Sequence, residues 1–227
     1  MKIKFGALVV AGSGKIGGHV AAKNRSGAYL RTKVTPVNLR STSQVGARTR
    51  LSTISIAWRG LLAAQRLQWN NAVSSFSKTD IFGDLRNPSG FNLFQKLNNN
   101  LVNAGIVAID VPPLPIAVPS LISLTPTQAS GGATSLAYTA TPTPADVVLI
   151  IKATAPISPG KSFVKSEFRQ IGQVAEAGAS PFVATTAYAA KFGGPGLAGQ
   201  KVFFEAFYIS TVSGQAGQPI QASCIVT

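Results

Sequence analysis

Apolar positions between residues 42 and 76 recur at steps of three and four, the spacing that places side chains on one face of a helix. Gly60 falls where the first apolar stripe ends, and glycine is suited to the left-handed conformation that closes a helix. The pattern therefore predicts a helix hairpin whose break lies between Gly60 and Leu62. The residues expected to be its packing anchors are Leu51, Ile54, Trp58, Trp69 and Phe76.

The polar side of this predicted hairpin carries cations and no carboxylate. Its basic residues include Arg48, Arg59 and Arg66. Nearly continuous helices would place these three side chains on one line, whereas a sharp turn at Gly60 would divide them between two surfaces. The turn angle therefore decides whether the hairpin presents one basic stripe or two separate contacts.

A third helix is predicted between Ser89, which is suited to cap it, and Gly105, which is suited to end it. Its apolar residues recur mainly at three- and four-residue steps. Asparagines at 98–100 and at 103 form its polar side, which we interpret as a solvated or inter-subunit hydrogen-bonding face. Before the helices, residues 1–40 alternate short apolar runs with glycine and basic residues, which predicts short strands or an extended arm.

Prolines between residues 112 and 119 predict a stiff, extended linker, after which the pattern changes to strand-like runs separated by turn signals. These runs cover residues 121–125, 134–141, 147–153, 162–168, 182–189, 202–210 and 220–226. Seven such runs predict a small antiparallel sandwich. The sixth run carries apolar residues on both faces, so one of its faces is a candidate interface.

Together these elements predict an α+β protein of two domains. A basic N-terminal part with short strands or an extended arm, a helix hairpin and a third helix is followed by an all-β sandwich. The expected boundaries are 1–111 for the basic arm and helical domain, 112–119 for the proline-rich linker and 120–227 for the β-sandwich domain.

Charge is distributed unevenly along the chain. Its 227 residues contain 21 Lys and Arg against 7 Asp and Glu, and residues 1–111 hold 15 of the basic residues but only 3 of the acidic ones. No carboxylate precedes Asp80, so the basic side chains of this half must meet water, nucleic acid or an acidic partner protein. The candidate contacts are Lys15, Lys23, Arg25, Arg31, Lys33, Arg40, Arg48, Arg50, Arg59 and Arg66.

Two interpretations of these cations stay open. One is a solvated basic surface, and the other is contact with nucleic-acid phosphates, whose affinity would fall with salt. Tyr29 is the only aromatic residue between Phe5 and Trp58, so a platform on which bases stack is poorly supported.

Residues 12–17 satisfy the G-x-G-x-x-G pattern and follow a strand-like run, as in a dinucleotide-binding fingerprint. That site also needs a helix after the last glycine and a carboxylate about twenty residues further on. Here no helical apolar stripe follows, and the later positions offer Lys33 and Thr35. A phosphate loop is excluded because Val9 and Ile16 replace its first glycine and its metal-binding hydroxyl. We interpret 12–17 as a structural turn or a tightly packed arm.

Few residues suit catalysis or metal binding. The single Cys224, interpreted as a buried small hydrophobe, excludes an intrachain disulfide and a cysteine-based zinc site, and His19 is the only histidine. Asp80 and Asp84 flank Gly83 in a predicted loop with no base beside them. We therefore expect no catalytic residue, cofactor, metal or small-molecule substrate. No apolar run approaches the roughly 18 to 20 residues that cross a bilayer, so neither membrane contact nor a cleaved signal is expected.

Two parts of the chain resemble known families. Residues 203–219 resemble the penultimate strand, glycine-containing turn and last strand of a fibronectin type III domain, which implies an immunoglobulin-like sandwich. The first half resembles an uncharacterised family of proteins from bacteriophages and Bacteroidota. The matching features are the G-K-I-G-G sequence at 14–18, Tyr29 and Arg31, and then Trp58, Leu61, Gln65, Arg66 and Trp69. Relatives look as though they have Thr or Ser in a Thr-x-x-Gln capping box where this chain has Leu62.

The resemblances imply a phage structural component more than an enzyme. The first hypothesis is a non-enzymatic bacteriophage virion protein of the capsid shell, its surface or the head–tail structure, assembled in many copies in the host cytoplasm. Its expected partners are other copies of itself, other virion proteins and, through backbone phosphates, packaged nucleic acid. The alternatives are a nucleic-acid-binding protein that uses the basic half and a host-surface adhesin that uses the sandwich.

Overall fold

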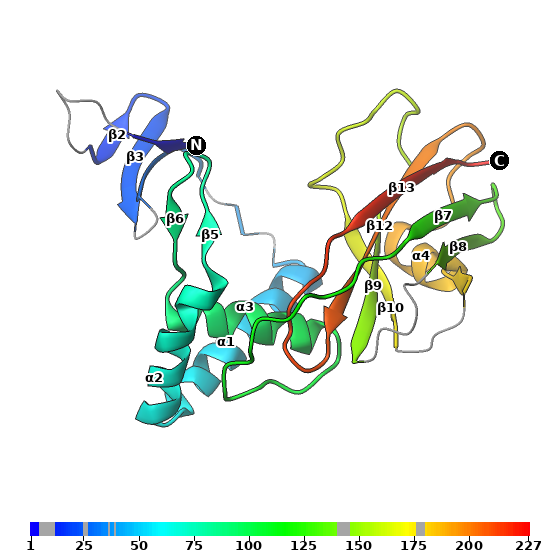
Figure 1. The fold of residues 1–227 in the computed structure, drawn as a ribbon. Helices are drawn as coiled ribbons and strands as arrows, with labels where there is room; N and C mark the ends of the chain where they lie inside the picture. The colour runs from blue at the N-terminus through cyan, green and yellow to red at the C-terminus, as the bar shows by residue number, and fades with distance from the viewer. Residues whose placement is uncertain (5–11, 25–26, 36, 39, 140–145, 176–179) are drawn as a thin grey trace.

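The computed structural model describes residues 1–4, 12–24, 27–35, 37–38, 40–139, 146–175 and 180–227. Within these residues the chain forms four α-helices and thirteen strands in four antiparallel sheets, which confirms the α+β class. Figure 1 shows the helices and two small sheets of the N-terminal half on one side and the larger sheets of the C-terminal half on the other.

The first four strands form a small sheet, which we call the arm sheet. Its strands are β1 (Lys2–Ile3), β2 (Gly14–Ile16), β3 (His19–Asn24) and β4 (Gly27–Thr32). They lie in the order β1-β4-β3-β2. Ile16 pairs with His19 across Gly17, whose φ of 55° is a left-handed conformation that favours glycine. The G-x-G-x-x-G sequence therefore runs through strand β2 into a turn at Gly17 and Gly18 and not into a helix, so only the end of residues 12–17 is a turn.

A short hairpin connects the arm sheet with the helices. Its strands are β5 (Lys78–Thr79) and β6 (Leu85–Arg86). Figure 1 shows the tip of this hairpin beside the N-terminus. Lys2 Nζ lies 3.5 Å from the Asp80 carboxylate, and Lys4 Nζ lies 2.9 Å from the Asp84 carboxylate. These two ion pairs attach the arm sheet to the hairpin tip.

The three predicted helices form, with breaks where they were expected. They are α1 (Thr42–Gly60), α2 (Ala63–Ala72) with its 3₁₀ continuation η1 (Val73–Phe76), and α3 (Gly90–Asn103). Ser89 Oγ accepts a hydrogen bond from the Asn92 N–H at 3.2 Å, and Gly105 follows α3 with a φ of 74°. Gly60 ends α1, but the left-handed turn expected there is wrong because Leu61 makes the turn with extended backbone.

α1 and α2 both pack against α3 and barely touch each other, and Figure 1 shows them running in different directions. Ile54 of α1 and Trp69 of α2 are buried in one cluster that Leu93, Phe94 and Leu97 of α3 complete. The apolar face of α3 therefore serves both helices. The predicted hairpin is therefore a pair of helices at an angle to each other. Both of them pack on α3, which in turn contacts the C-terminal sheet.

The C-terminal half contains two sheets around one core. Its elements are β7 (Ser123–Gln128), β8 (Thr134–Thr139), β9 (Val147–Ala153), β10 (Arg169–Val174), β11 (Phe182–Val183), α4 (Thr185–Phe192), β12 (Lys201–Ser210) and β13 (Ile220–Ile225). One sheet has the order β10-β9-β12-β13 and the other β11-β8-β7. Leu136, Ile151, Val202 and Phe204 are fully buried in the core that both sheets contribute to.

Two of the seven predicted strands are wrong. Residues 162–168 form no strand, since the chain turns at 165–167, and the fourth strand is the more polar β10 that follows. In residues 182–189 only Phe182 and Val183 are extended, and the rest belongs to α4. Alanines favour this helix, and Gly193 closes it with a φ of 85°. The C-terminal half is therefore not all-β.

The outer face of the β9–β12 sheet packs against the end of α3. Val148, Ile150 and Ile209 form a cluster there with Ala104. This cluster buries, within one chain, part of the face that the sequence marks as a candidate interface.

Three asparagines of α3, Asn98, Asn100 and Asn103, make structural hydrogen bonds, so the expected role as a solvated or inter-subunit face is wrong for these three. Asn98 is fully buried, donates to the Ile109 carbonyl at 3.1 Å and accepts from the Ile109 N–H at 2.7 Å. Asn100 Nδ2 donates to the Gly214 carbonyl at 2.8 Å, and Asn103 Nδ2 to Gln170. These bonds fix the start of the proline-rich segment and join α3 to the sheets.

Alkaline pH is expected to destabilise the core through Tyr188. The Tyr188 hydroxyl is buried and donates to the Thr154 carbonyl at 2.9 Å, and burial raises its pKa to about 12 from an ordinary value of 10.0. Because the pKa of Tyr188 is higher in the folded than in the unfolded state, its neutral hydroxyl contributes fully to the free energy of unfolding below pH 10. This contribution is lost as pH rises through about 12. Tyr188→Phe should lose about 1–3 kcal/mol at neutral pH, because the Thr154 carbonyl loses its donor.

Urea unfolding followed by circular dichroism at several pH values measures this effect. The difference between wild type and Tyr188→Phe should shrink as the pH rises above 10. The half-buried Tyr29→Phe serves as a control. A difference that stays constant from pH 7 to pH 12 would show that Tyr188 does not carry the alkaline sensitivity.

Candidate basic interface

One face of the arm sheet collects two of the predicted cations. Lys15 of β2, Val20 of β3 and Arg31 of β4 lie in one cross-strand row. Because residues opposite each other in a sheet point to the same side, Lys15 and Arg31 share a face. Lys23, at an odd number of residues from Val20, lies on the other face. All three cations are exposed.

The exposed cations continue from the arm sheet onto α1. Lys33 and Arg40 lie between β4 and α1, where Arg40 has a φ of 47°, and Arg48 and Arg59 follow on the helix. Eleven residues is close to three helical turns, so Arg48 and Arg59 lie on nearly the same line, about 16 Å apart along the axis. Arg48 Nη2 donates to Asn38 Oδ1 at 2.9 Å, which holds the segment before α1 beside the helix.

Two other candidates do not belong to this surface. Arg50 is half-buried and donates to Asn103 Oδ1 at 2.7 Å, so it joins α1 to α3, and its expected role as an external contact is wrong. Arg66 is exposed on α2, which diverges from α1, so the hairpin presents two separate contacts and not one stripe. Arg25 lies outside the described residues.

Of the three carboxylates of this half, Asp80 and Asp84 are already engaged elsewhere, and Asp110 takes part in no ion pair among the described residues. Asp80 and Asp84 pair with Arg86 at 3.4 and 3.2 Å and with the two lysines of the arm. Among the described residues, no carboxylate lies within ion-pair distance of the other exposed cations of the arm sheet, of the segment after it, or of α1 and α2. These are Lys15, Lys23, Arg31, Lys33, Arg40, Arg48, Arg59 and Arg66. Their counter-charges must therefore come from outside the described part of the chain.

Asp80 is the central residue of the hairpin tip, with a side chain only 2% exposed. Burial raises its pKa, but hydrogen bonds from the Phe82 and Asp84 N–H groups, together with Arg86 and Lys2, lower it more, so the net pKa lies below its ordinary value. Because the pKa of Asp80 is lower in the folded than in the unfolded state, its carboxylate stabilises the fold at pH values above its unfolded-state pKa. This stabilisation is lost as pH falls through the folded-state pKa.

Asp80→Asn should therefore lower the melting temperature at neutral pH, because asparagine cannot pair with Lys2 or Arg86. The difference from wild type should begin to shrink below about pH 4, the ordinary range of an unfolded aspartate, and shrink further as pH falls through the lowered pKa of the folded state. Melting curves between pH 7 and pH 3 measure it. Asp146→Asn is the control, because Asp146 is exposed with a φ of 57°, which asparagine tolerates. An equal loss at all pH values would contradict the ion-pair role.

Four of the five predicted packing anchors lie in the helical core. Trp69 is fully buried and donates from Nε1 to the Asp110 carbonyl at 2.8 Å, and Ile54 is 2% exposed. Trp58 is half-buried with its ring centroid 5.3 Å from that of Phe94, and Phe76 packs against the same cluster. The expectation for Leu51 is wrong, because its side chain is 48% exposed on a side of α1 that no described element covers.

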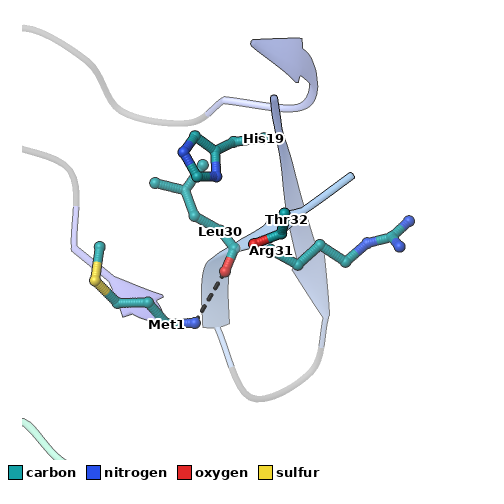
Figure 2. Close-up of a pocket in the computed structure, with 5 residues that line it drawn as sticks. All are labelled: Met1, His19, Leu30, Arg31 and Thr32. Carbon is teal, nitrogen blue, oxygen red and sulfur yellow. Dashed lines mark hydrogen bonds between the residues drawn. The ribbon is translucent and has the colours of Figure 1, made fainter. Parts of the chain in front are cut away.

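Figure 2 shows a pocket of about 310 Å³ on the arm sheet, with the amine of Met1 donating to the Leu30 carbonyl at 2.9 Å. Its other lining residues are His19, Arg31 and Thr32. The Arg31 guanidinium points away from the rest of the lining in this view. Among the described residues of the lining, His19 is therefore a titratable side chain without a carboxylate beside it.

The described residues hold no group of three or more His, Cys, Asp and Glu that could bind a metal ion. Cys224 is half-buried, and burial raises the pKa of its thiol, which disfavours the reactive thiolate. No helix in the described part of the chain is both long and apolar enough to span a membrane.

The sequence pattern did not reveal the residues that position the cations. Asn38 holds the segment before α1 against Arg48, and Asp80 holds the arm sheet through Lys2. The only available signal was the scarcity of carboxylates, since Asp80 and Asp84 are the only two in the first hundred residues. Neither the scan against protein-family models nor the search of curated proteins finds a match.

Proposed function

We propose that this chain is a non-enzymatic structural protein of a bacteriophage virion, belonging to the capsid shell, its surface or the head–tail structure, and present in many copies. The proposal rests mainly on the exposed cations of the N-terminal half that have no carboxylate partner among the described residues. The helices of this half pack against the sheets of the C-terminal half through α3. Such a basic surface suits an external acidic partner, and an assembled particle supplies one in its nucleic acid or in neighbouring proteins.

The contacts between the two halves of the chain support a structural role in an assembled particle. Apolar contacts at Val148, Ile150 and Ile209 and the Asn100–Gly214 hydrogen bond keep α3 against the β9–β12 sheet. Contacts of this kind hold the two halves in a fixed arrangement. A particle component that binds one neighbour with each half requires such an arrangement. The proline-rich segment is attached too, because Gln215 Nε2 donates to the Leu114 carbonyl at 3.1 Å.

The helices also leave apolar side chains for contacts between proteins. Val45, Leu51 and Ile56 are exposed on α1, and Leu62 and Leu67 are exposed at the start and on the side of α2. Exposed apolar residues that recur over neighbouring elements are typical of interaction surfaces. We assign contacts with other virion proteins to this region, since the outer sheet face is partly covered by α3.

The C-terminal half supports the proposed fibronectin type III-like sandwich. Its first, second and fifth strands form one sheet and the other four form the second, with β12 and β13 paired as the last hairpin. Helix α4 between the fifth and sixth strands is a departure from an all-β sandwich. Domains of this architecture serve many functions, so this assignment concerns the fold.

Quantitative mass spectrometry of purified particles of the encoding phage tests the proposal. The chain should be present in a fixed ratio to the major capsid protein and should resist salt washing that removes a phage-encoded replication enzyme used as a control. A chain that is expressed during infection but is absent from the particles, or that washes away with the control enzyme, would refute the proposal.

A further inference from the structure

We propose that one surface of this chain binds the phosphate backbone of nucleic acid without reading its sequence. This surface, the cation track, consists of Lys15, Arg31, Lys33, Arg40, Arg48 and Arg59. The inference deepens the proposed function by naming the acidic partner, and it rests on that function only for the biological setting. Binding by the purified chain can fail while the chain remains a virion component, so the two proposals are tested separately.

The cation track is continuous along the chain. Lys15 and Arg31 share one face of the arm sheet, and the segment after β4 then runs to the start of α1 (Figure 1). The Arg48–Asn38 hydrogen bond keeps this segment beside the helix. Arg59 extends the track by about 16 Å beyond Arg48. Cations that follow one another over several elements suit an extended polyanion, which carries a charge every ~1.7 Å of duplex axis.

Between its arginines the outward side of α1 offers polar groups that suit phosphate oxygens. Ser52 lies one turn after Arg48 and seven residues before Arg59, so all three share a helix face, and Ser52 is exposed. Serine hydroxyls and arginine guanidinium groups are the side chains that commonly contact phosphates. Arg59 keeps its guanidinium near the helix by donating from Nε to the Ser55 carbonyl at 3.3 Å, which leaves its terminal nitrogens free to donate.

A second copy of the chain is a poor occupant of the track. A self-complementary contact would bring identical arginines together, and no described carboxylate lies close enough to neutralise them. The track also has no platform for reading bases. Tyr29 is half-buried, Trp58 packs against Phe91 and Phe94, and Trp69 is fully buried. Binding must then come from phosphate contacts, and its affinity must depend steeply on salt.

Fluorescence anisotropy of the full chain with a labelled duplex of about 30 bp, titrated at several salt concentrations, tests the inference. Each phosphate contact contributes about −0.9 to the slope of log K against log salt. Arg48→Gln with Arg59→Gln should reduce the magnitude of the slope by about 1.8, whereas Arg48→Lys with Arg59→Lys, which keeps the charge, should restore it. Circular dichroism checks that each variant is folded.

A matched control separates the track from net charge. Lys165→Gln with Lys191→Gln removes two exposed cations from the C-terminal half and lowers the net charge equally, so it should leave the slope unchanged. Equal effects of the two double variants, or no binding at low salt, would overturn the inference. Polyglutamate of the same total charge serves as competitor. Competition as strong as that of unlabelled duplex would overturn it in favour of an acidic protein partner.

Discussion

Replacing Trp69 with alanine is expected to destabilise the folded chain by about 3–5 kcal/mol, the range for removing a fully buried large aromatic side chain. Its ring is fully buried and meets Phe94 edge-on at a centroid distance of 5.2 Å. The same substitution removes the indole donor of the Asp110 carbonyl, so it loosens the start of the proline-rich segment as well as the packing of α2 on α3. Equilibrium unfolding in urea measures the loss.

Leu51→Ala is the matched control for this prediction. Leu51 also belongs to the apolar pattern of residues 42–76, but its side chain is 48% exposed, so its loss should be within about 0.5 kcal/mol. Trp69→Phe should retain most of the packing while losing the hydrogen bond. Comparable losses for Leu51→Ala and Trp69→Ala would contradict the observed burial and favour the packing role that the periodicity predicts for both residues.

Replacing Gly214 with alanine is expected to separate α3 from the sheets. Gly214 has a φ of 68°, and a Cβ atom there would lie 2.4 Å from the Leu97 carbonyl oxygen of α3. The left-handed backbone costs an alanine about 1–2 kcal/mol. The clash adds about 1–3 kcal/mol more, because the helix must move and the Asn100–Gly214 hydrogen bond must lengthen or break.

Gly131→Ala provides the control for backbone strain alone. Its φ of 66° matches that of Gly214, and a Cβ atom there would meet nothing within 4 Å. Hydrogen exchange should therefore accelerate at the end of α3 and in the β12–β13 turn for Gly214→Ala, and stay near wild type there for Gly131→Ala. If both variants behaved alike, the close approach of α3 to this turn would be refuted.

The sequence predicts the strongly periodic and strongly apolar elements of this fold. The boundaries of β9 coincide with the predicted run at 147–153, and the helices break where Gly60 and Leu62 indicate. Such elements can be predicted from the sequence because a helix or strand that is buried on one or both faces needs apolar residues at regular spacing. Periodicity does not say what a face packs against, so the angled arrangement of α1 and α2 around α3 could not be read from it.

Weakly patterned elements were missed for identifiable reasons. Strand β10 (Arg169–Val174) lies at a sheet edge and has only two apolar side chains, so the more apolar run before it resembled a strand better. Helix α4 is short and begins with two β-branched threonines, which favour strands, although Gly193 gave a helix-ending signal. Both errors come from competing local preferences that tertiary packing decided.

The candidate site was predictable in composition but not in geometry. The sequence places Arg48 and Arg50 two residues apart with equal claims to an external partner. In the structure Arg48 faces solvent beside Asn38, whereas Arg50 faces α3 and bonds Asn103. Helical spacing separates these two directions, but only the position of α3 tells which of them is covered.

If the chain is part of the virion and its cation track faces packaged nucleic acid, as we propose, the two should crosslink within intact particles. Ultraviolet crosslinking of intact purified particles, followed by mass spectrometry of nucleotide-modified peptides, tests this proposal most directly. We expect crosslinks in peptides from residues 29–66, and none in peptides from β9, β12 or β13. Particles that contain the chain but show crosslinks only in its C-terminal half, or none in either half, would contradict it.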